Sequence, residues 1–158
     1  MSPGRPARRR PPLRRLLLVL LALACKAEEP NPDPPGALLR DSLGLTESDR
    51  VPRVRLAGGP DGDVVDPPLV EVEPGGYVEF YTRDRRVRTV SFQLDSMSVE
   101  QADFLRSTGQ EGSPPLVELD SRFVVSFQDA PPGRYSFVVQ GNGEPVAGVV
   151  VVRSEPPG

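Results

Sequence analysis

Short segments with apolar residues at alternate positions, separated by glycine and proline, run from residue 51 to residue 153. Alternation with a period of two is typical of strands with one buried face, and glycine and proline favour the turns between them. The candidate strands are 53–57, 69–73, 77–82, 88–94, 116–118, 122–128, 134–140 and 146–153. Many short strands at this spacing predict a Greek-key β-sandwich. A chain of 158 residues is long enough for one such domain.

One segment between the candidate strands breaks the alternation and predicts a helix. Ser98 stands three residues before Gln101, and this pair matches a capping box, in which each side chain bonds the other residue's backbone amide. Apolar Ala102 and Leu105 follow on one face, and Gly109 is expected to end the helix. The predicted fold class is therefore all-β, a Greek-key β-sandwich with one short inserted helix.

The N-terminus predicts export from the cytoplasm. Arginines precede an apolar run at 16–24, and this run is less than half of the roughly 20 residues that a membrane helix needs. Residues 1–24 are therefore predicted to be a signal peptide. They end at Cys25, the only cysteine, in a pattern that resembles a bacterial lipoprotein signal. The resemblance implies lipidation of Cys25, and the alternative is an ordinary signal peptide with an incidental cysteine.

The mature chain is expected to be an acidic, lipid-anchored protein of the cell envelope, facing the periplasm or the cell exterior. Lys26 follows Cys25 where an inner-membrane retention signal has aspartate, so the outer membrane is favoured. Six of the 19 basic residues lie before Leu16, which leaves 13 basic against 22 acidic residues and a net charge of −9. Such a surface disfavours nucleic acid as a partner. Export by the general or by the twin-arginine route stays open.

Composition divides the mature chain into three parts. Residues 25–50 are rich in proline and charge, so they are predicted to form a flexible Pro-rich tether attached to lipid, in which a short helix at 41–48 is an alternative. Residues 51–153 are predicted to form the sandwich. Residues 154–158 are a tail.

Three stretches of the sandwich carry motifs of a known family. Residues 88–92 read RTVSF, residues 132–142 read PGRYSFVVQGN, and residues 146–150 read VAGVV. They resemble, in order, the H-x-V-x-F strand and the P-G-x-Y-x-F-x-C-x-x-H…M-x-G-x-V ending of the cupredoxin (plastocyanin-like) family. The resemblance covers the whole domain and implies its β-sandwich, with Tyr135 as a tyrosine corner.

The same resemblance implies that the copper ligands of the family are replaced. Arg88 stands at the position of the first histidine, Val139 at the cysteine, Asn142 at the second histidine and Val146 at the axial methionine. A blue-copper site needs two imidazoles and a thiolate, and the chain contains no histidine. We therefore expect no cofactor and no metal, and we expect Val139 and Val146 to pack in the core.

Arginines gather in one loop of an otherwise acidic domain, at the end of the sandwich where the family keeps its metal. Guanidinium groups suit bidentate contact with carboxylates, so these arginines are candidates for binding a partner protein. In the alternative, Arg88 pairs with a neighbouring Asp or Glu and the other arginines are solvated. The candidate residues are Arg83, Arg85, Arg86 and Arg88.

Three aspartates, Asp61, Asp63 and Asp66, are expected on a turn. Three carboxylates suit a hard cation such as calcium, but their spacing does not match an EF-hand loop. A solvated turn is the simpler hypothesis.

The residue inventory argues against catalysis. Without histidine or a cysteine in the domain, a hydrolase would need a serine–lysine pair, a tyrosine or two carboxylates, and the only lysine is Lys26 in the tether. We therefore expect a non-enzymatic, metal-free envelope lipoprotein that acts as a binding or accessory module. Its expected partners are the membrane, through the lipid on Cys25, and an envelope protein. The alternatives are a copper-binding electron-transfer protein and a purely structural envelope domain.

Overall fold

The computed structural model describes residues 37–46 and 51–154. The predicted signal peptide, Cys25, most of the predicted tether and the last four residues of the predicted tail lie outside this range. Within the tether segment, α1 (Ala37–Leu43) is helical, earlier in the chain than the helix weighed for 41–48. It ends because Gly44 adopts a left-handed backbone (φ 63°) and the Leu45 amide bonds the Arg40 carbonyl.

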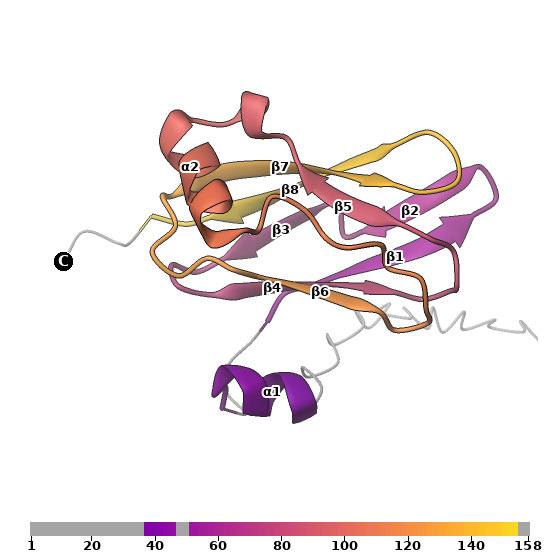
Figure 1. Cartoon of the computed structure of the whole chain (residues 1–158), viewed down its shortest axis with the longest axis horizontal. Helices are drawn as coiled ribbons and strands as arrows, with labels where there is room; N and C mark the ends of the chain where they lie inside the picture. Colours follow the sequence, from indigo (N-terminus) through magenta and orange to yellow (C-terminus); the bar gives the residue numbers. More distant parts are fainter. Residues whose placement is uncertain (1–36, 47–50, 155–158) are drawn as a thin grey trace, which may run out of the picture. The chain divides into compact units, whose positions relative to one another are not determined.

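The first sheet has the strand order β2-β1-β4-β6 (Figure 1). β1 (Arg53–Gly59) pairs antiparallel with β2 (Gly62–Asp66) and parallel with β4 (Tyr77–Thr82). β6 (Arg122–Ser126) completes the sheet antiparallel to β4.

The second sheet has the order β3-β8-β7-β5. β3 (Leu69–Val72) lies parallel to β8 (Val146–Val152), and β7 (Gly133–Gln140) runs antiparallel to both β8 and β5 (Thr89–Phe92). The motifs that prompted the family resemblance thus form three neighbouring strands of one sheet.

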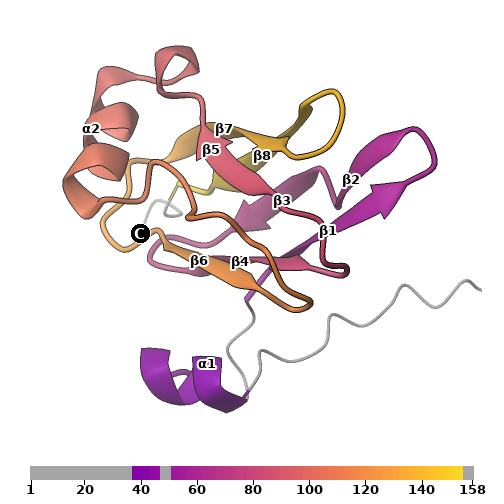
Figure 2. The ribbon, with the colours of Figure 1, turned by 45° about the vertical axis from the view of Figure 1, so that its right-hand side comes forward.

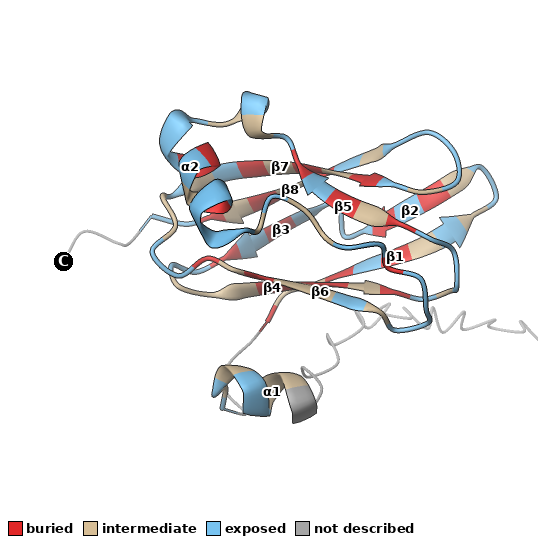
Figure 3. Ribbon diagram, viewed as in Figure 1, coloured by how far each residue is buried: buried red, intermediate tan, exposed pale blue. Residues whose placement is uncertain are grey.

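The core lies between the two sheets, where the alternate residues of each strand meet (Figure 3). At its centre the Phe80 ring packs edge-on against Phe137, with 4.9 Å between ring centroids. Phe137 also lies against Gly148, where a Cβ atom would collide with the ring. Because residue 148 is glycine, the Phe137 ring of β7 can pack directly on the backbone of β8. The predicted all-β sandwich with one inserted helix is confirmed.

The inserted segment comprises η1 (Leu94–Ser96) and α2 (Val99–Thr108). The predicted capping box is present, because the Gln101 amide donates to Ser98 Oγ and the Ser98 amide donates to Gln101 Oε1. Gly109 ends the helix in the left-handed region, as predicted. Figures 1 and 2 show α2 at the end of the sandwich away from the β1–β2 and β7–β8 hairpins.

Two local predictions are wrong. Residues 116–118 form no strand, because only Leu116 pairs, in an isolated bridge with Arg88, and the preceding prolines carry no amide hydrogen. Residues 62–66, expected as part of a turn, form β2. Asp63 and Val65 both face inward, and the residue after each of them is exposed. Among the described helices, none is long and apolar enough to cross a membrane.

Candidate functional site

Three loops meet at one end of the sandwich, which we call the loop end. They are the β1–β2 turn, residues 83–88 between β4 and β5, and residues 141–145 between β7 and β8. A hydrogen bond connects the first two loops: the Gly58 amide, next to the β1–β2 turn, donates to the Asp84 carboxylate. The third loop packs against them at Gly141, where a Cβ atom would collide with the Asp63 carboxylate and lie 3.0 Å from Arg88 Cγ. The predicted copper-ligand positions and the basic cluster all belong to this end.

Arg88 is buried at the loop end, with 0% of its surface exposed. Its Nε atom donates to Asp63 Oδ1 at 2.9 Å, and Nη2 lies 2.8 Å from the same oxygen. Toward Asp84, Nη1 donates to Oδ1 at 2.6 Å and Nη2 to Oδ2 at 3.1 Å. Nη1 also donates to the Arg86 carbonyl at 3.3 Å. Every guanidinium nitrogen therefore has an acceptor inside the protein, as a buried charge requires.

The two carboxylates keep Arg88 charged. Burial alone would lower the pKa of Arg88, but hydrogen bonds and attraction from Asp84 and Asp63 outweigh it and raise this pKa above the ordinary arginine value. The Arg88 hydrogen bond is also the main reason why the pKa of Asp84 lies well below its usual 3.8, helped by the backbone amides of Arg86 and Gly58. Arg88 and Asp84 are therefore both ionised at neutral pH.

Asp63 supplies the fully buried side of this cluster. Its side chain is 1% exposed, and its second oxygen, Oδ2, has no hydrogen-bond donor among the described residues. That oxygen faces Gly141, whose missing side chain makes room for it. The β7–β8 loop can close over the Asp63–Arg88 pair because residue 141 is glycine.

The remaining copper-ligand positions differ in burial. Val139 is completely buried in the core between Val90 and Val146 of the neighbouring strands, as predicted. Val146 is half-buried and packs against the core edge, so its prediction holds in part. Asn142 is exposed in the β7–β8 loop.

These residues do not fit copper. One position holds a fixed cation that would repel the metal, two hold aliphatic side chains, and the fourth holds an exposed amide. None supplies the thiolate or imidazole that a blue-copper site uses. The carboxylates near Arg88 are occupied by its guanidinium, and the described residues contain no group of three or more His, Cys, Asp or Glu suited to a metal ion.

The structure divides the predicted basic cluster. Arg88 is removed from the partner-binding candidates, because a buried, saturated guanidinium presents nothing to a partner. Arg83, Arg85 and Arg86 are exposed, and Arg83 pairs with Asp120 at 3.3 Å. The Arg86 guanidinium lies over Gly58, since a Cβ atom there would collide with it. For Arg88 the alternative expectation, pairing with a neighbouring carboxylate, is therefore correct.

The proposed cation turn is not formed. Asp63 faces inward to Arg88, whereas Asp66 pairs with Arg55 at 2.8 Å on the opposite face of β2. Asp61 lies outside the strand, in the exposed turn before it. The alternation of β2 thus separates the carboxylates that the sequence places together.

Asp63 and Asp84 are functional-site residues that sequence reasoning missed. Asp63 was expected on a solvated or cation-binding turn, and Asp84 was not predicted as a site residue. A signal was present in the spacing: Arg88 stands two residues before Val90, and Asp63 two before Val65, each on the inward face of its strand. An arginine and an aspartate at inward positions indicate buried charges that need partners, but the spacing does not say which residues pair.

A second buried ion cluster stabilises the first sheet. Glu79 is completely buried on β4, and Arg53 Nε donates to its Oε2 at 2.6 Å. Arg122 Nη1 lies 3.0 Å from Oε1 without hydrogen-bond alignment. Arg53 also stacks over the Tyr81 ring, 4.2 Å from its centroid. These contacts join β1, β4 and β6 side by side.

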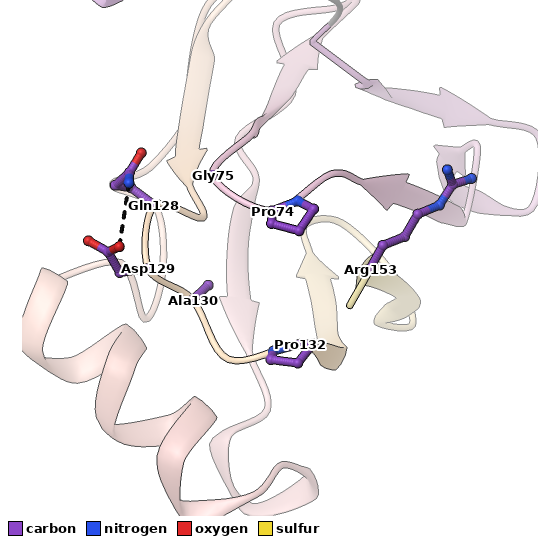
Figure 4. A pocket seen from close by; sticks show the side chains of 7 residues that line it. All are labelled: Pro74, Gly75, Gln128, Asp129, Ala130, Pro132 and Arg153. Carbon is purple, nitrogen blue, oxygen red and sulfur yellow. Dashed lines mark hydrogen bonds between the residues drawn. The ribbon is translucent and has the colours of Figure 1, made fainter. Parts of the chain in front are cut away.

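The opposite end of the sandwich carries an open hollow of about 480 Å³ (Figure 4). Its lining residues come from the turns before β4 and β7 and from the end of β8: Pro74, Gly75, Gln128, Asp129, Ala130, Pro132 and Arg153. Gln128 lies against Asp129, and Arg153 is engaged by Glu71 and Glu73. Nearby, the Tyr135 hydroxyl donates to the Pro131 carbonyl at 2.6 Å, the predicted tyrosine corner, and burial raises the pKa of Tyr135 to about 12.

Comparison with known proteins finds similarity at the level of solved structures. No protein-family profile and no curated protein sequence matches the chain. Oxidized plastocyanin from Dryopteris crassirhizoma is 18% identical, with 64% of this chain and 99% of that chain covered and a TM-score of 0.49. A purple cupredoxin from Nitrosopumilus maritimus is 19% identical, with 65% and 99% covered and a TM-score of 0.44.

A third similar structure is the P52G mutant of amicyanin in its reduced Cu(I) form. It is 17% identical, with 67% of this chain and 85% of that chain covered and a TM-score of 0.43. The structural neighbours are thus cupredoxins, the family that the sequence motifs resemble.

Proposed function

We propose that this chain is a non-enzymatic, metal-free β-sandwich that acts as a binding module in the bacterial cell envelope. The observation that carries the proposal is the burial of Arg88 between Asp63 and Asp84. The protein's own guanidinium is the cation at the loop end, where it joins β2 to the loop of residues 83–88. A site built this way supplies a stable surface and has no room for copper chemistry.

The side chains at the loop end support a role without catalysis. The described residues contain no histidine, cysteine or lysine, which are among the side chains that enzymes most often use as nucleophiles or general bases. Arg88 holds the Asp84 carboxylate ionised, which makes Asp84 a poor proton donor at neutral pH. What the loop end offers is shape and surface charge.

Attachment to the membrane through a lipid on Cys25 completes the proposed role. The signal-like segment before Cys25 and the Lys26 that follows it support anchoring at the outer membrane. A tethered acidic domain would reach an envelope protein from that surface.

The experiment that tests this role uses the full chain produced in its native bacterium. Membrane fractions are analysed by mass spectrometry for a diacylated or triacylated N-terminal Cys25, and proteins retained by the solubilised chain are quantified against a Cys25→Ser control. We expect a lipidated N-terminus and at least one envelope protein retained in stoichiometric amount. An unmodified soluble chain would refute the anchor, and retention of nothing above the background of a mock purification would refute the binding role.

A further inference from the structure

Three of the six large apolar side chains that the described residues expose lie together beside the loop end. Val87 is 53% exposed, Val117 47% and Leu119 51%. Their proximity follows from register: the Arg88 and Leu116 backbones exchange hydrogen bonds of 3.1 and 2.8 Å, which places Val87 opposite Val117. Because Arg88 and Leu116 face inward, their neighbours on both segments face outward.

Two exposed arginines, Arg85 and Arg86, directly precede Val87 in the chain. Arg85 lines an open hollow of about 440 Å³ together with Glu118 and Leu119. The guanidinium of Arg86 rests on the Gly58 backbone. Among the described residues, neither Arg85 nor Arg86 has a carboxylate partner, in contrast to Arg83 and Arg88. We call the surface formed by Arg85, Arg86, Val87, Val117 and Leu119 the loop patch.

Hydrogen bonds that Asp84 and Thr82 make fix the two segments that carry the loop patch. The Asp84 carboxylate fixes the loop of residues 83–88 by accepting hydrogen bonds from the backbone amides of Gly58 and Arg86, at 2.7 and 2.9 Å. The Thr82 hydroxyl donates to the Glu118 carbonyl, and the Asp120 amide donates to the Thr82 carbonyl at 3.0 Å. A surface that is already ordered loses little entropy on binding, which favours a recognition role.

We propose that the loop patch binds a partner protein through a segment in which an apolar side chain is flanked by Asp or Glu. The apolar side chain would cover Val87, Val117 and Leu119, and the carboxylates would pair with Arg85 and Arg86. This inference rests on the binding role proposed above and specifies the partner's chemistry.

Charge distinguishes such a partner from a second copy of this chain. Residues 51–154 carry 10 arginines against 15 Asp or Glu, so two copies repel each other overall. If two loop patches met face to face, Arg85 and Arg86 of one copy would also repel the same arginines of the other copy. An acidic segment meets the arginines directly, and screening over about 8 Å at physiological salt weakens repulsion from more distant carboxylates.

The test is site-specific photo-crosslinking of the full chain in its native envelope. Benzoylphenylalanine is placed at Val117 and, in a matched control, at Val99, which is 75% exposed on α2. We expect cross-links from position 117 to a protein segment whose sequence, determined by mass spectrometry, has Asp or Glu beside the captured apolar residue. Position 99 should give only background.

Charge reversal provides the second arm. Arg85→Glu with Arg86→Glu should lower the cross-link yield at position 117 roughly tenfold, since two exposed ion pairs become like-charge contacts. The control, Arg106→Glu with Arg134→Glu, changes two other exposed arginines by the same charge and should leave the yield unchanged.

Each result decides between the proposals. Cross-links from position 99 without any from position 117 would leave the binding role standing and overturn the loop patch. A captured segment without carboxylates, or capture of the chain itself, would overturn the partner class. Equal losses in the two charge-reversal pairs would show non-specific electrostatics and overturn the pairing with Arg85 and Arg86. Absence of cross-links at both positions would overturn both proposals.

Discussion

Arg88 shows how one side chain decides the chemistry of the loop end. An arginine is expensive to bury, and here the cost is offset by two carboxylates and a carbonyl that accept from its three nitrogens. The sequence places Arg88 in a basic run, which suggests solvent exposure. Its spacing from Val90 indicates the inward face, but the partner Asp63, 25 residues earlier, is known only once the two sheets are placed together.

Removing only one member of the buried pair should destabilise the protein strongly. Arg88→Met leaves Asp63 buried without a counter-charge, so the free energy of unfolding should fall by about 3–5 kcal/mol. Arg88→Met combined with Asp63→Val replaces the pair by apolar side chains and should recover most of this loss. Urea unfolding of the single and double variants, with Arg85→Met as an exposed control, measures the difference. If the two single losses simply add in the double variant, the pair is not coupled as described.

Asp84 makes stability depend on pH in acid. Because its pKa in the folded protein is lower than the ordinary 3.8, its contribution is present above about pH 4 and is lost as the pH falls toward the folded value. Asp84→Asn removes the titrating group. The variant should be less stable than the parent at pH 7, and the difference should shrink between about pH 4 and pH 2.

Urea unfolding at a series of pH values measures this dependence. Asp103→Asn, at an exposed carboxylate of α2, serves as the control and should follow the parent closely. A constant difference between Asp84→Asn and the parent across the acidic range would contradict the assigned cause.

At the level of elements, residues 110–116 close the side of the sandwich where β5 and β6 would otherwise expose their edges. The Phe92 amide donates to the Glu111 carbonyl, and the Ser113 amide donates to the Val90 carbonyl, so one edge is covered by backbone. On the other edge, the Gln110 side chain accepts from the Ser126 amide at 2.7 Å and donates to the Ser126 carbonyl at 3.0 Å. The amide side chain thus replaces a neighbouring strand.

The Gln110 side chain should accordingly stabilise the edge of β6 and slow hydrogen exchange there. Gln110→Ala leaves both backbone groups of Ser126 without their partner and should lower the free energy of unfolding by about 1–2 kcal/mol. Hydrogen exchange of the Ser126 amide should accelerate more than that of other β6 amides. Gln93→Ala, at an exposed glutamine, is the control. Unchanged exchange at Ser126 would show that the bond contributes nothing in solution.

Local patterns predicted most elements because they depend on neighbouring residues. The capping box of α2 and the glycine that ends it follow from Ser98, Gln101 and Gly109 alone. β2 was missed because Gly62 and three aspartates suggest a turn, whereas its pairing with β1 and the burial of Asp63 depend on distant residues. Residues 116–118 were wrongly predicted from their apolar composition, although the two prolines directly before them, which carry no amide hydrogen, are visible in the sequence.

On the scale of the whole molecule, a buried cluster of charged side chains stabilises one end of the sandwich, and the other end carries an open hollow. The loop end gathers the replaced ligand positions, the buried Arg88 cluster and the loop patch. The alternating strands, together with the motifs in β5, β7 and β8, predicted the fold because they mark core positions. They were not sufficient to predict what fills the loop end, since the filling residues come from β2 and from a loop outside those motifs.

The most direct test of this account is NMR observation of the Arg88 guanidinium in the purified protein, before and after one equivalent of Cu(II) is added. A guanidinium bonded on every nitrogen should give resolved, slowly exchanging Nε and Nη proton signals, assigned by their loss in Arg88→Met, while exposed Arg85 exchanges rapidly. These signals should persist unchanged with copper. Rapid exchange at Arg88, or selective paramagnetic broadening of its signals at one equivalent, would contradict a loop end closed by the protein's own cation.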